Sequence, residues 1–195
     1  MKDMRLFIAL NISTFLLKRI GHTIEELKAY LPPKGLRWVP IDNMHLTLKF
    51  LGVVSASKMH EIQLALIKTA EQSKPCNIEI GKLGAYPGIL KPRVIWIGVS
   101  SDHHLINLYK NLEKNLTYVG YEPERRGFTP HITLARISKQ AASTEIAQIS
   151  SALSKLDIAL LGTCSINAIH LLRSELNRTG AVYSELFSTP INANI

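Results

Sequence analysis

Apolar residues along the chain occur either in short continuous runs or at helical spacing, and the two patterns alternate. Short apolar runs bounded by turn residues predict strands, whereas apolar residues three or four positions apart predict helices. The helical spacing predicts helices over residues 57–71, 102–118 and 143–153. It also predicts a first helix that follows Asn11 or Ser13 and ends near residue 30. The short apolar runs predict strands over residues 5–10, 45–51, 78–83, 94–99, 131–136, 157–161, 164–172 and 182–189, with a hairpin turn at Gly180.

The order of the predicted elements repeats along the chain. Each half reads strand, helix, strand, helix, strand, and the middle strand begins with His-x-Thr-Leu in both halves, at His45 and at His131. The interval from Ile8 to His45 is nearly equal to the interval from Ile97 to His131. A three-residue motif often recurs by chance, but the same motif at the same place in two copies of one unit is much rarer. The agreement therefore predicts an internal duplication.

This duplication favours fold class α+β. Alternating strands and helices bury their apolar faces in layers, here as antiparallel or mixed sheets flanked by helices. We expect pseudo-repeats over about residues 4–85 and 92–190, and residues 1–195 as a single bilobal domain. A pseudo-two-fold axis would then bring the two His-Thr strands together, with an active-site groove between the lobes.

Both repeated segments present an imidazole and a hydroxyl on one strand face. Successive strand side chains point to opposite faces, so His45 shares a face with Thr47, and His131 with Thr133. A lone His on a strand is more often a structural residue, and Thr is ordinary in strands. The recurrence of the His-x-Thr pair at the same place in both halves is what favours a functional role for these residues. The five histidines without such recurrence are His22, His60, His103, His104 and His170.

Two imidazoles facing each other across a groove can act as an acid–base pair, because the unperturbed pKa of His is about 6.5. A neutral imidazole can take a proton from water while a protonated one gives a proton to a leaving oxygen. Displacement at phosphorus needs both on opposite sides of the phosphorus atom, and hydroxyls can donate hydrogen bonds to its non-bridging oxygens. No His, Asp or Glu stands at metal-ligand spacing from either motif, so we expect neither a metal nor another cofactor.

Cationic side chains near the second motif are candidate phosphate contacts. Arg136 is an odd number of positions from His131, so a regular strand would place it on the opposite face, unless a bulge turns it back. We expect Arg125 and Arg126 at the rim of the groove, with Lys49 nearby. Two aromatic residues precede the motifs and could stack on a base, although packing is the expected role of each: Trp38 and Phe128.

The bulk composition is compatible with this interpretation. The 195 residues are 46% hydrophobic and carry a net charge of +8, which favours an anionic partner such as nucleic acid or nucleotide, although such charge also serves solubility. Cys76 and Cys164 form no disulfide framework and are expected to be reduced. The short apolar run at residues 6–10 is too short for a signal peptide, and no stretch is long enough to span a membrane, so we expect a cytoplasmic protein.

The motifs resemble those of a known superfamily. Residues 45–52, His-Leu-Thr-Leu-Lys-Phe-Leu-Gly, and residues 129–136, Thr-Pro-His-Ile-Thr-Leu-Ala-Arg, look like the paired motifs of the 2H phosphoesterases. Residues 5–10, 94–98 and 171–183 are similar to its bacterial LigT-like branch, the RNA 2′,3′-cyclic phosphodiesterases. The likeness covers nearly the whole chain, and the signature positions show no departure.

The resemblance implies hydrolysis of a 2′,3′-cyclic phosphate at an RNA end to a 2′-phosphate. It implies that His45 donates a proton to the leaving 3′ oxygen, that His131 activates water, and that Thr47 and Thr133 hold the phosphate oxygens, with Arg136 as a possible further contact. The resemblance also implies a reversible 2′-5′ ligation that joins RNA ends, such as tRNA halves. Two alternatives remain: an RNA-end-binding module without turnover, and a phosphodiesterase for small cyclic nucleotides. We expect a monomer.

Overall fold

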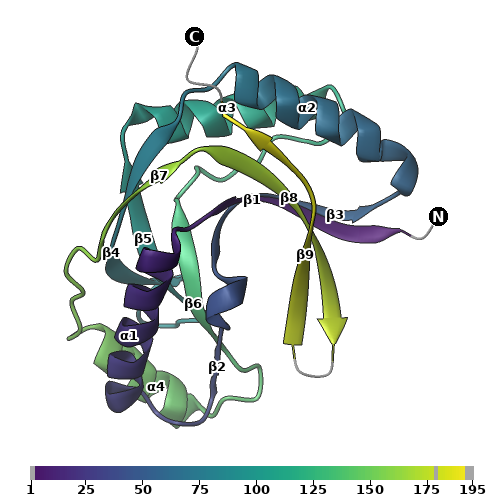
Figure 1. Ribbon diagram of the computed structural model, residues 1–195. Helices are drawn as coiled ribbons and strands as arrows, with labels where there is room; N and C mark the ends of the chain where they lie inside the picture. The colour runs from purple at the N-terminus through teal and green to yellow at the C-terminus, as the bar shows by residue number, and fades with distance from the viewer. Residues whose placement is uncertain (1–2, 178–179, 192–195) are drawn as a thin grey trace.

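The computed structural model describes residues 3–177 and 180–191, which fold into two antiparallel sheets and four helices (Figure 1). The first sheet has the order β3-β1-β8-β9, and its strands are β3 (His45–Val54), β1 (Met4–Asn11), β8 (Ala168–Asn177) and β9 (Gly180–Pro190). The second has the order β2-β6-β5-β4-β7, and its strands are β2 (Leu36–Trp38), β6 (His131–Ile137), β5 (Val94–Ser101), β4 (Cys76–Tyr86) and β7 (Gly162–Ile166). The α+β prediction is confirmed, and the sheets are antiparallel rather than mixed.

The four predicted helices are present. They are α1 (Thr14–Tyr30), α2 (Met59–Glu71), α3 (His103–Thr117) and α4 (Ser143–Leu153). Ser13, rather than Asn11, caps α1, because its side-chain oxygen accepts a hydrogen bond from the Leu16 backbone N–H. Asp102 caps α3 in the same way through the backbone N–H of His104. Aliphatic side chains from both sheets and all four helices share one core.

Each sequence half contributes to both sheets. Helices α2 and α3 lie side by side, and α2 also contacts β8 and β9 of the first sheet, whereas α1 contacts β7 of the second (Figure 1). Strand β4 follows α2 in the chain but belongs to the second sheet, and β8 returns from the second half to pair with β1. The boundary between the sheets therefore does not coincide with the boundary between the predicted pseudo-repeats. Strands β3 and β6, which carry the two motifs, contact each other where the sheets meet.

Some predicted strand boundaries were wrong. Residues 157–161 form no strand, since they run beside β4 with only isolated backbone contacts. The strand expected over 164–172 is interrupted at Asn167, where the chain leaves β7 in the second sheet and enters β8 in the first. Strand β3 continues past Gly52, whose positive φ of 73° accommodates a register shift opposite β1. Asn177 pairs with Gly180, as the predicted hairpin requires, while the two residues between them lie outside the described ranges.

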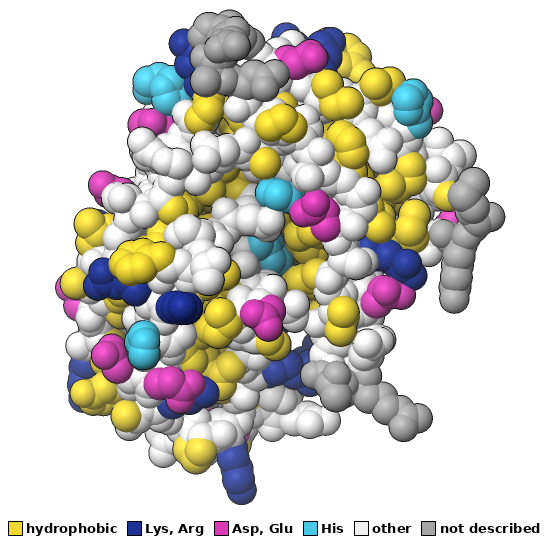
Figure 2. Space-filling view, in the orientation of Figure 1, with side chains coloured by type: hydrophobic (Ala, Val, Ile, Leu, Met, Phe, Trp, Pro, Cys, Tyr) yellow, Lys and Arg dark blue, Asp and Glu magenta, His cyan; other side chains and the backbone are white. Residues whose placement is uncertain are grey.

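The described surface shows neither a membrane-spanning helix nor a large cationic patch on the face in view. None of the helices within residues 3–177 and 180–191 is long and apolar enough to cross a bilayer. Lys and Arg side chains are spread over the face seen in Figure 2, interspersed with Asp and Glu.

Candidate active site

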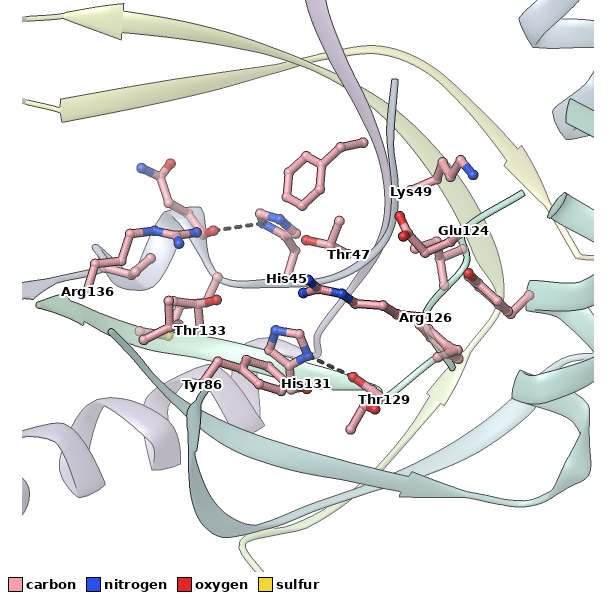
Figure 3. A pocket seen from close by; sticks show the side chains of 18 of the residues that line it. His45, Thr47, Lys49, Tyr86, Glu124, Arg126, Thr129, His131, Thr133 and Arg136 are labelled. Carbon is pink, nitrogen blue, oxygen red and sulfur yellow. Dashed lines mark hydrogen bonds between the residues drawn. The ribbon is translucent and has the colours of Figure 1, made fainter. Parts of the chain in front are cut away.

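A groove of about 590 Å³ lies where β3 and β6 meet, and it contains the side chains that the repeated motifs predicted (Figure 3). His45 and Thr47 line it from the first sheet, and His131 and Thr133 line it from the second. These four side chains come from two strands that are 86 positions apart in sequence. The structure thus brings together all four motif residues in one cavity.

Both imidazoles are oriented by the same type of hydrogen bond. His45 Nδ1 lies 2.8 Å from the carbonyl oxygen of Asn43, and His131 Nδ1 lies 2.8 Å from the carbonyl oxygen of Thr129. In each case the carbonyl belongs to the residue two positions upstream, and a carbonyl can only accept, so Nδ1 carries the proton. The Nε2 atom of each ring is left for proton transfer in the groove. The Asn43 side chain in turn donates to the Ala181 carbonyl of β9 at 2.7 Å, which ties this turn to the sheet.

Aromatic rings hold His45 from the first sheet. Its ring centroid is 4.8 Å from that of Phe7 on β1 and 5.4 Å from that of Tyr183 on β9, which meets it nearly edge-on at 77°. Phe7 belongs to a small apolar cluster with Ala9 and Leu172, separate from the main core. This packing buries the imidazole and removes water from it.

Aromatic rings also hold His131, in a similar arrangement from the second sheet. Tyr86 on β4 meets the imidazole edge-on at 75°, with ring centroids 5.0 Å apart, and Trp96 on β5 lies 5.9 Å away. The Trp96 ring occupies the space above Gly84, where an added Cβ would overlap it. A glycine is therefore required at this position for the Trp96 ring to reach His131.

Burial lowers the pKa of His45 from 6.5 to about 4. Loss of water around the ring is the largest cause, and the positive charge of Arg136 lowers the pKa further, while the hydrogen bond to the Asn43 carbonyl opposes both. In the protein without substrate, His45 is therefore neutral at physiological pH. An anion bound beside the ring would raise its pKa again, because an opposite charge favours the protonated form.

Arg136 lines the groove because of a β-bulge in β6. The register between β5 and β6 passes from Ile95–Ala135 to Trp96–Thr133, which leaves Leu134 as an extra residue. Leu134 and Ala135 are then both buried, and the alternation of faces reverses after them. The guanidinium consequently shares the face of His131 and lines the cavity.

The other cationic candidates occupy three different environments. Lys49 also contacts the groove, but its ammonium is buried in an ion pair with Glu113 at 2.8 Å. Arg126 lines the groove, whereas Arg125 is exposed and is not among the lining residues. Among the residues described, neither Arg126 nor Arg136 is in an ion pair.

The two aromatic candidates mainly have packing roles. Phe128 stacks on Tyr109 with ring centroids 4.0 Å apart and an interplanar angle of 4°, and both rings line the groove. Trp38 packs against the main core from β2 and is not among the groove-lining residues. The expectation of packing is therefore confirmed for Trp38, while Phe128 presents part of its ring to the cavity.

Three residues that pack against the motif histidines carried no signal in the sequence pattern: Phe7, Tyr86 and Tyr183. Each comes from a strand other than the two motif strands, and only strand pairing brings it to a histidine. Glu124, which lines the groove from the connection between α3 and β6, also carried no signal. Outside the groove, His170 contacts Glu185 at 2.7 Å between β8 and β9. Within residues 3–177 and 180–191, no group of three or more His, Cys, Asp or Glu side chains is placed to hold a metal ion.

This geometry is suited to displacement at phosphorus. Two imidazoles present Nε2 to one cavity, two hydroxyls stand beside them, and a guanidinium lies at one side. An oxyanion placed among these groups would receive hydrogen bonds and positive charge without rearrangement of the protein.

Comparisons with known proteins show which sequences and folds this chain resembles. The family model described as the 2′-5′ RNA ligase superfamily matches residues 17–178. An "RNA 2′,3′-cyclic phosphodiesterase" of Aquifex aeolicus is 30% identical over 187 residues, which is 94% of this chain and 95% of the relative. Among solved structures, TT0787 of Thermus thermophilus has a TM-score of 0.80 at 23% identity, with 98% of this chain and 100% of that chain covered. E. coli LigT complexed with 3′-AMP has a TM-score of 0.76 at 26% identity, with 97% and 99% covered.

Proposed function

The chain belongs to the 2′-5′ RNA ligase superfamily, and from this we propose that it hydrolyses RNA 2′,3′-cyclic phosphate ends to 2′-phosphomonoesters. One observation carries the proposal: two imidazoles, each fixed through Nδ1 to a carbonyl two residues upstream, present Nε2 to one groove with two threonine hydroxyls. Relatives with the printed name RNA 2′,3′-cyclic phosphodiesterase match most of this chain, which supports the same substrate class here.

The proposed reaction is an in-line displacement. His131 Nε2 takes a proton from water while the water oxygen forms a bond to phosphorus. The bond from phosphorus to the 3′ oxygen breaks on the opposite side, and His45 Nε2 gives that oxygen a proton. The product is a 2′-phosphate with a free 3′ hydroxyl, and exchange of protons with solvent restores both rings.

The charge that develops on the phosphate needs donors on its non-bridging oxygens. Thr47 and Thr133 would donate hydrogen bonds there, and Arg136 would supply a charge-assisted contact. These three side chains and the two imidazoles surround one volume, so the substrate can be held with its reacting bond between the two rings.

The low pKa of His45 has to be reconciled with its role as proton donor. Neutral His45 cannot donate from Nε2, because its only proton is on Nδ1. We infer that the phosphate anion raises the pKa of His45 on binding, so that the ring takes up a proton as the complex forms. If the two histidines exchanged roles, the other oxygen would leave and the product would be a 3′-phosphate.

The second candidate activity is the same displacement with an RNA hydroxyl in place of water. The matching family model is described as the 2′-5′ RNA ligase superfamily, and attack of a 5′ hydroxyl on the cyclic phosphate, with release of the 3′ oxygen, joins two RNA ends through a 2′-5′ bond without any other reactant. Which of the two reactions prevails depends on the concentrations of RNA ends and water rather than on a separate site. Processing of tRNA halves, a monomeric state and a cytoplasmic location stay predictions.

The test is incubation of the protein with an oligonucleotide that ends in a 2′,3′-cyclic phosphate, followed by identification of the product by mass and by comparison with synthetic 2′- and 3′-phosphate standards. A 2′-phosphate product supports the function and the assigned roles. A 3′-phosphate product contradicts the assigned roles and the proposed 2′-phosphate product, but it still supports hydrolysis of cyclic phosphate ends. An unchanged, protected cyclic end contradicts the function and favours an RNA-end-binding module.

A further inference from the structure

Arg126 enters the groove from the side opposite Arg136, and its guanidinium is seen beside the two histidines (Figure 3). Arg126 comes from the exposed segment 122–129, which connects α3 to β6. The reacting phosphate already has two hydroxyls and Arg136 as contacts. Arg126 is therefore a second cationic group that enters the same cavity from another element and another side.

The charges that line the groove leave Arg126 available for an anion. Three cationic side chains and one carboxylate line the cavity: Lys49, Arg126, Arg136 and Glu124. The Lys49 ammonium is neutralised by Glu113. Among the residues described, no ion pair joins Arg126 to Glu124. Two guanidiniums thus face a single carboxylate, which gives the cavity a net positive charge.

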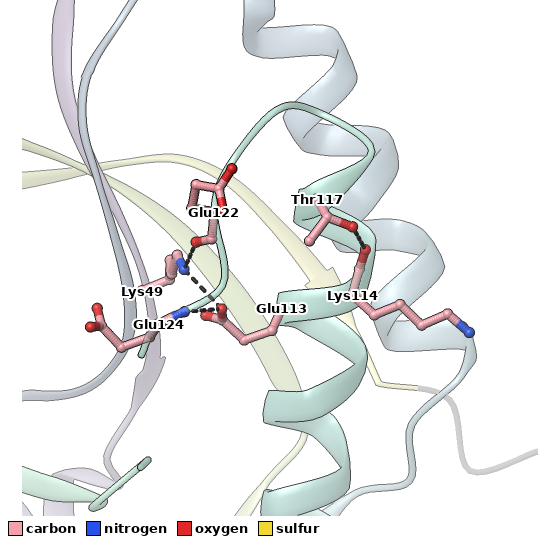
Figure 4. Close-up of polar contacts among 6 residues, drawn as sticks. All are labelled: Lys49, Glu113, Lys114, Thr117, Glu122 and Glu124. Carbon is pink, nitrogen blue, oxygen red and sulfur yellow. Dashed lines mark hydrogen bonds and ion pairs between the residues drawn. The ribbon is translucent and has the colours of Figure 1, made fainter. Parts of the chain in front are cut away.

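A buried ion pair holds the segment that carries Arg126 (Figure 4). Lys49 Nζ donates to Glu113 Oε2 at 2.8 Å and to the Glu122 carbonyl at 2.7 Å, while the Glu124 backbone N–H donates to the same Glu113 oxygen at 2.8 Å. The Lys49 and Glu113 side chains are only 9% and 11% exposed. This clamp, Lys49 and Glu113, ties the backbone just before Arg126 to β3 and α3.

The clamp is placed by the bulge in β3. The register between β1 and β3 passes from Ile8–Lys49 to Ala9–Thr47, which leaves Leu48 as an extra residue and turns Lys49 toward α3. A buried ion pair is costly to desolvate and need not add stability over apolar residues of similar size. Its two backbone contacts, however, specify where the segment lies. Positioning of Arg126 is therefore the role that these contacts support best.

We propose that Arg126 binds a second phosphate of the substrate, the phosphodiester on the 5′ side of the cyclic-phosphate nucleotide, and that the Lys49–Glu113 clamp positions it. This inference rests on the proposed function and deepens it, because it assigns a preference for RNA ends over mononucleotides. A nucleoside 2′,3′-cyclic monophosphate has only the reacting phosphate. An oligonucleotide has the next phosphodiester one nucleotide away, and a guanidinium is the side chain best suited to bind it.

The first experiment compares kcat/KM for a 2′,3′-cyclic-ended oligonucleotide with kcat/KM for the corresponding cyclic mononucleotide. Loss of one charge-assisted phosphate contact in Arg126→Ala should lower the ratio of the two constants about 10-fold. Arg125→Ala is the matched control, because Arg125 is the neighbouring exposed arginine and does not line the groove. The ratio of the two kcat/KM values for Arg125→Ala should equal the ratio for the wild type. An equal loss on both substrates in Arg126→Ala would mean that Arg126 contacts the reacting phosphate, and it would overturn the proposal.

Affinity for a 2′-phosphate-ended oligonucleotide gives an independent measurement. The slope of log Kd against log salt should fall by about 0.7 in Arg126→Ala, as expected for the loss of one phosphate contact to a single strand. The slope for Arg125→Ala should be unchanged. An unchanged slope in Arg126→Ala contradicts the second phosphate contact.

The clamp is tested with Lys49→Met/Glu113→Leu, which replaces both charges and leaves none buried alone. This double variant should show the same fall in the substrate ratio as Arg126→Ala, and adding Arg126→Ala to it should lower the ratio no further. Additive losses would overturn the positioning role of the clamp. If the wild type turned over neither the oligonucleotide nor the mononucleotide, the proposed function itself would be refuted. Failure of the proposed function is therefore distinguishable from failure of the second phosphate contact.

Discussion

Phe50 and Arg136 occupy equivalent positions in the two halves of the chain, and each lines the groove because a β-bulge precedes it. Each stands five positions after its motif histidine, and in each strand the bulge leaves two consecutive buried residues before it. Without the bulge, both side chains would lie on the opposite face from the histidine. The two halves thus share a β-bulge at the same position, but the residue after the bulge differs. It is an exposed aromatic ring in one half and a guanidinium in the other.

Arg136 is expected to contribute to turnover through the charge that it places beside the reacting phosphate. Arg136→Ala should lower kcat/KM about 10- to 100-fold, because a charge-assisted hydrogen bond is lost. Arg136→Lys should recover only part of the loss, since an ammonium lacks the planar, bidentate geometry. Steady-state kinetics on a cyclic mononucleotide measure this contact apart from Arg126. Full activity of Arg136→Ala would refute the contact.

The two histidines should be separately essential. His45→Ala and His131→Ala should each lower kcat about 100- to 10,000-fold, the usual range for loss of a general acid or base. Unchanged far-ultraviolet circular dichroism would exclude loss of the fold as the cause. EDTA should leave wild-type turnover unchanged, since the proposed steps use only side chains. Retention of full activity in either variant would contradict the acid–base pair.

The sequence allowed the pairing of the histidines to be predicted, but not the surroundings of either ring. Recurrence of His-x-Thr at the same place in two similar units was visible without coordinates, and it placed four side chains in one groove. Tyr86 and Tyr183 could not be found in this way, because their contacts with His131 and His45 depend on strand pairing between distant segments.

The position of Arg136 shows where strand periodicity fails. Alternation of faces is a local rule, and a bulge is caused by how two strands fit together rather than by the composition of either one. The same limit explains the wrong strand over residues 157–161, whose apolar composition suits a strand but which runs beside β4 at its irregularity between Gly81 and Leu83 and makes only isolated backbone hydrogen bonds there. Helices were predicted more accurately, because caps and apolar spacing are both local signals.

Gly84 should be intolerant of substitution. A Cβ at this position would overlap the Trp96 ring, which packs beside His131, so Gly84→Ala should displace that ring. We expect a loss of about 1 to 3 kcal/mol in the free energy of unfolding, as for other overpacked sites, together with lower kcat. Gly88→Ala is the control, since a Cβ there meets no atom within 4 Å. Urea denaturation measures the free energy of unfolding, and steady-state kinetics measure kcat. If both quantities in Gly84→Ala equal those of the wild type, the Trp96 ring can move without consequence.

The lowered pKa of His45 predicts how stability depends on pH. In the unfolded chain His45 has its ordinary pKa of 6.5, whereas burial lowers it to about 4 in the folded protein. Between these two values the unfolded chain holds a proton that the folded protein lacks, so lowering the pH favours unfolding. The contribution of this group to stability is thus fully present above about pH 6.5 and is lost as the pH falls to about 4. In urea denaturation, the difference between pH 7 and pH 4.5 should be smaller for His45→Asn than for the wild type, and equal differences would refute the low pKa.

The same group predicts proton uptake when a phosphate binds. An anion beside His45 raises the pKa of the ring, so at pH 6 the protein should take up a proton as it binds a nucleoside 2′-phosphate. Calorimetric titrations in two buffers with different ionisation enthalpies measure the number of protons taken up. The phosphate itself can also change protonation, so the informative quantity is the difference between the wild type and His45→Asn. The wild type should take up more protons than the variant, because only the wild type has the ring that must be protonated to donate to the leaving oxygen. Equal uptake would show that His45 stays neutral in the complex, which would assign the donor role to His131.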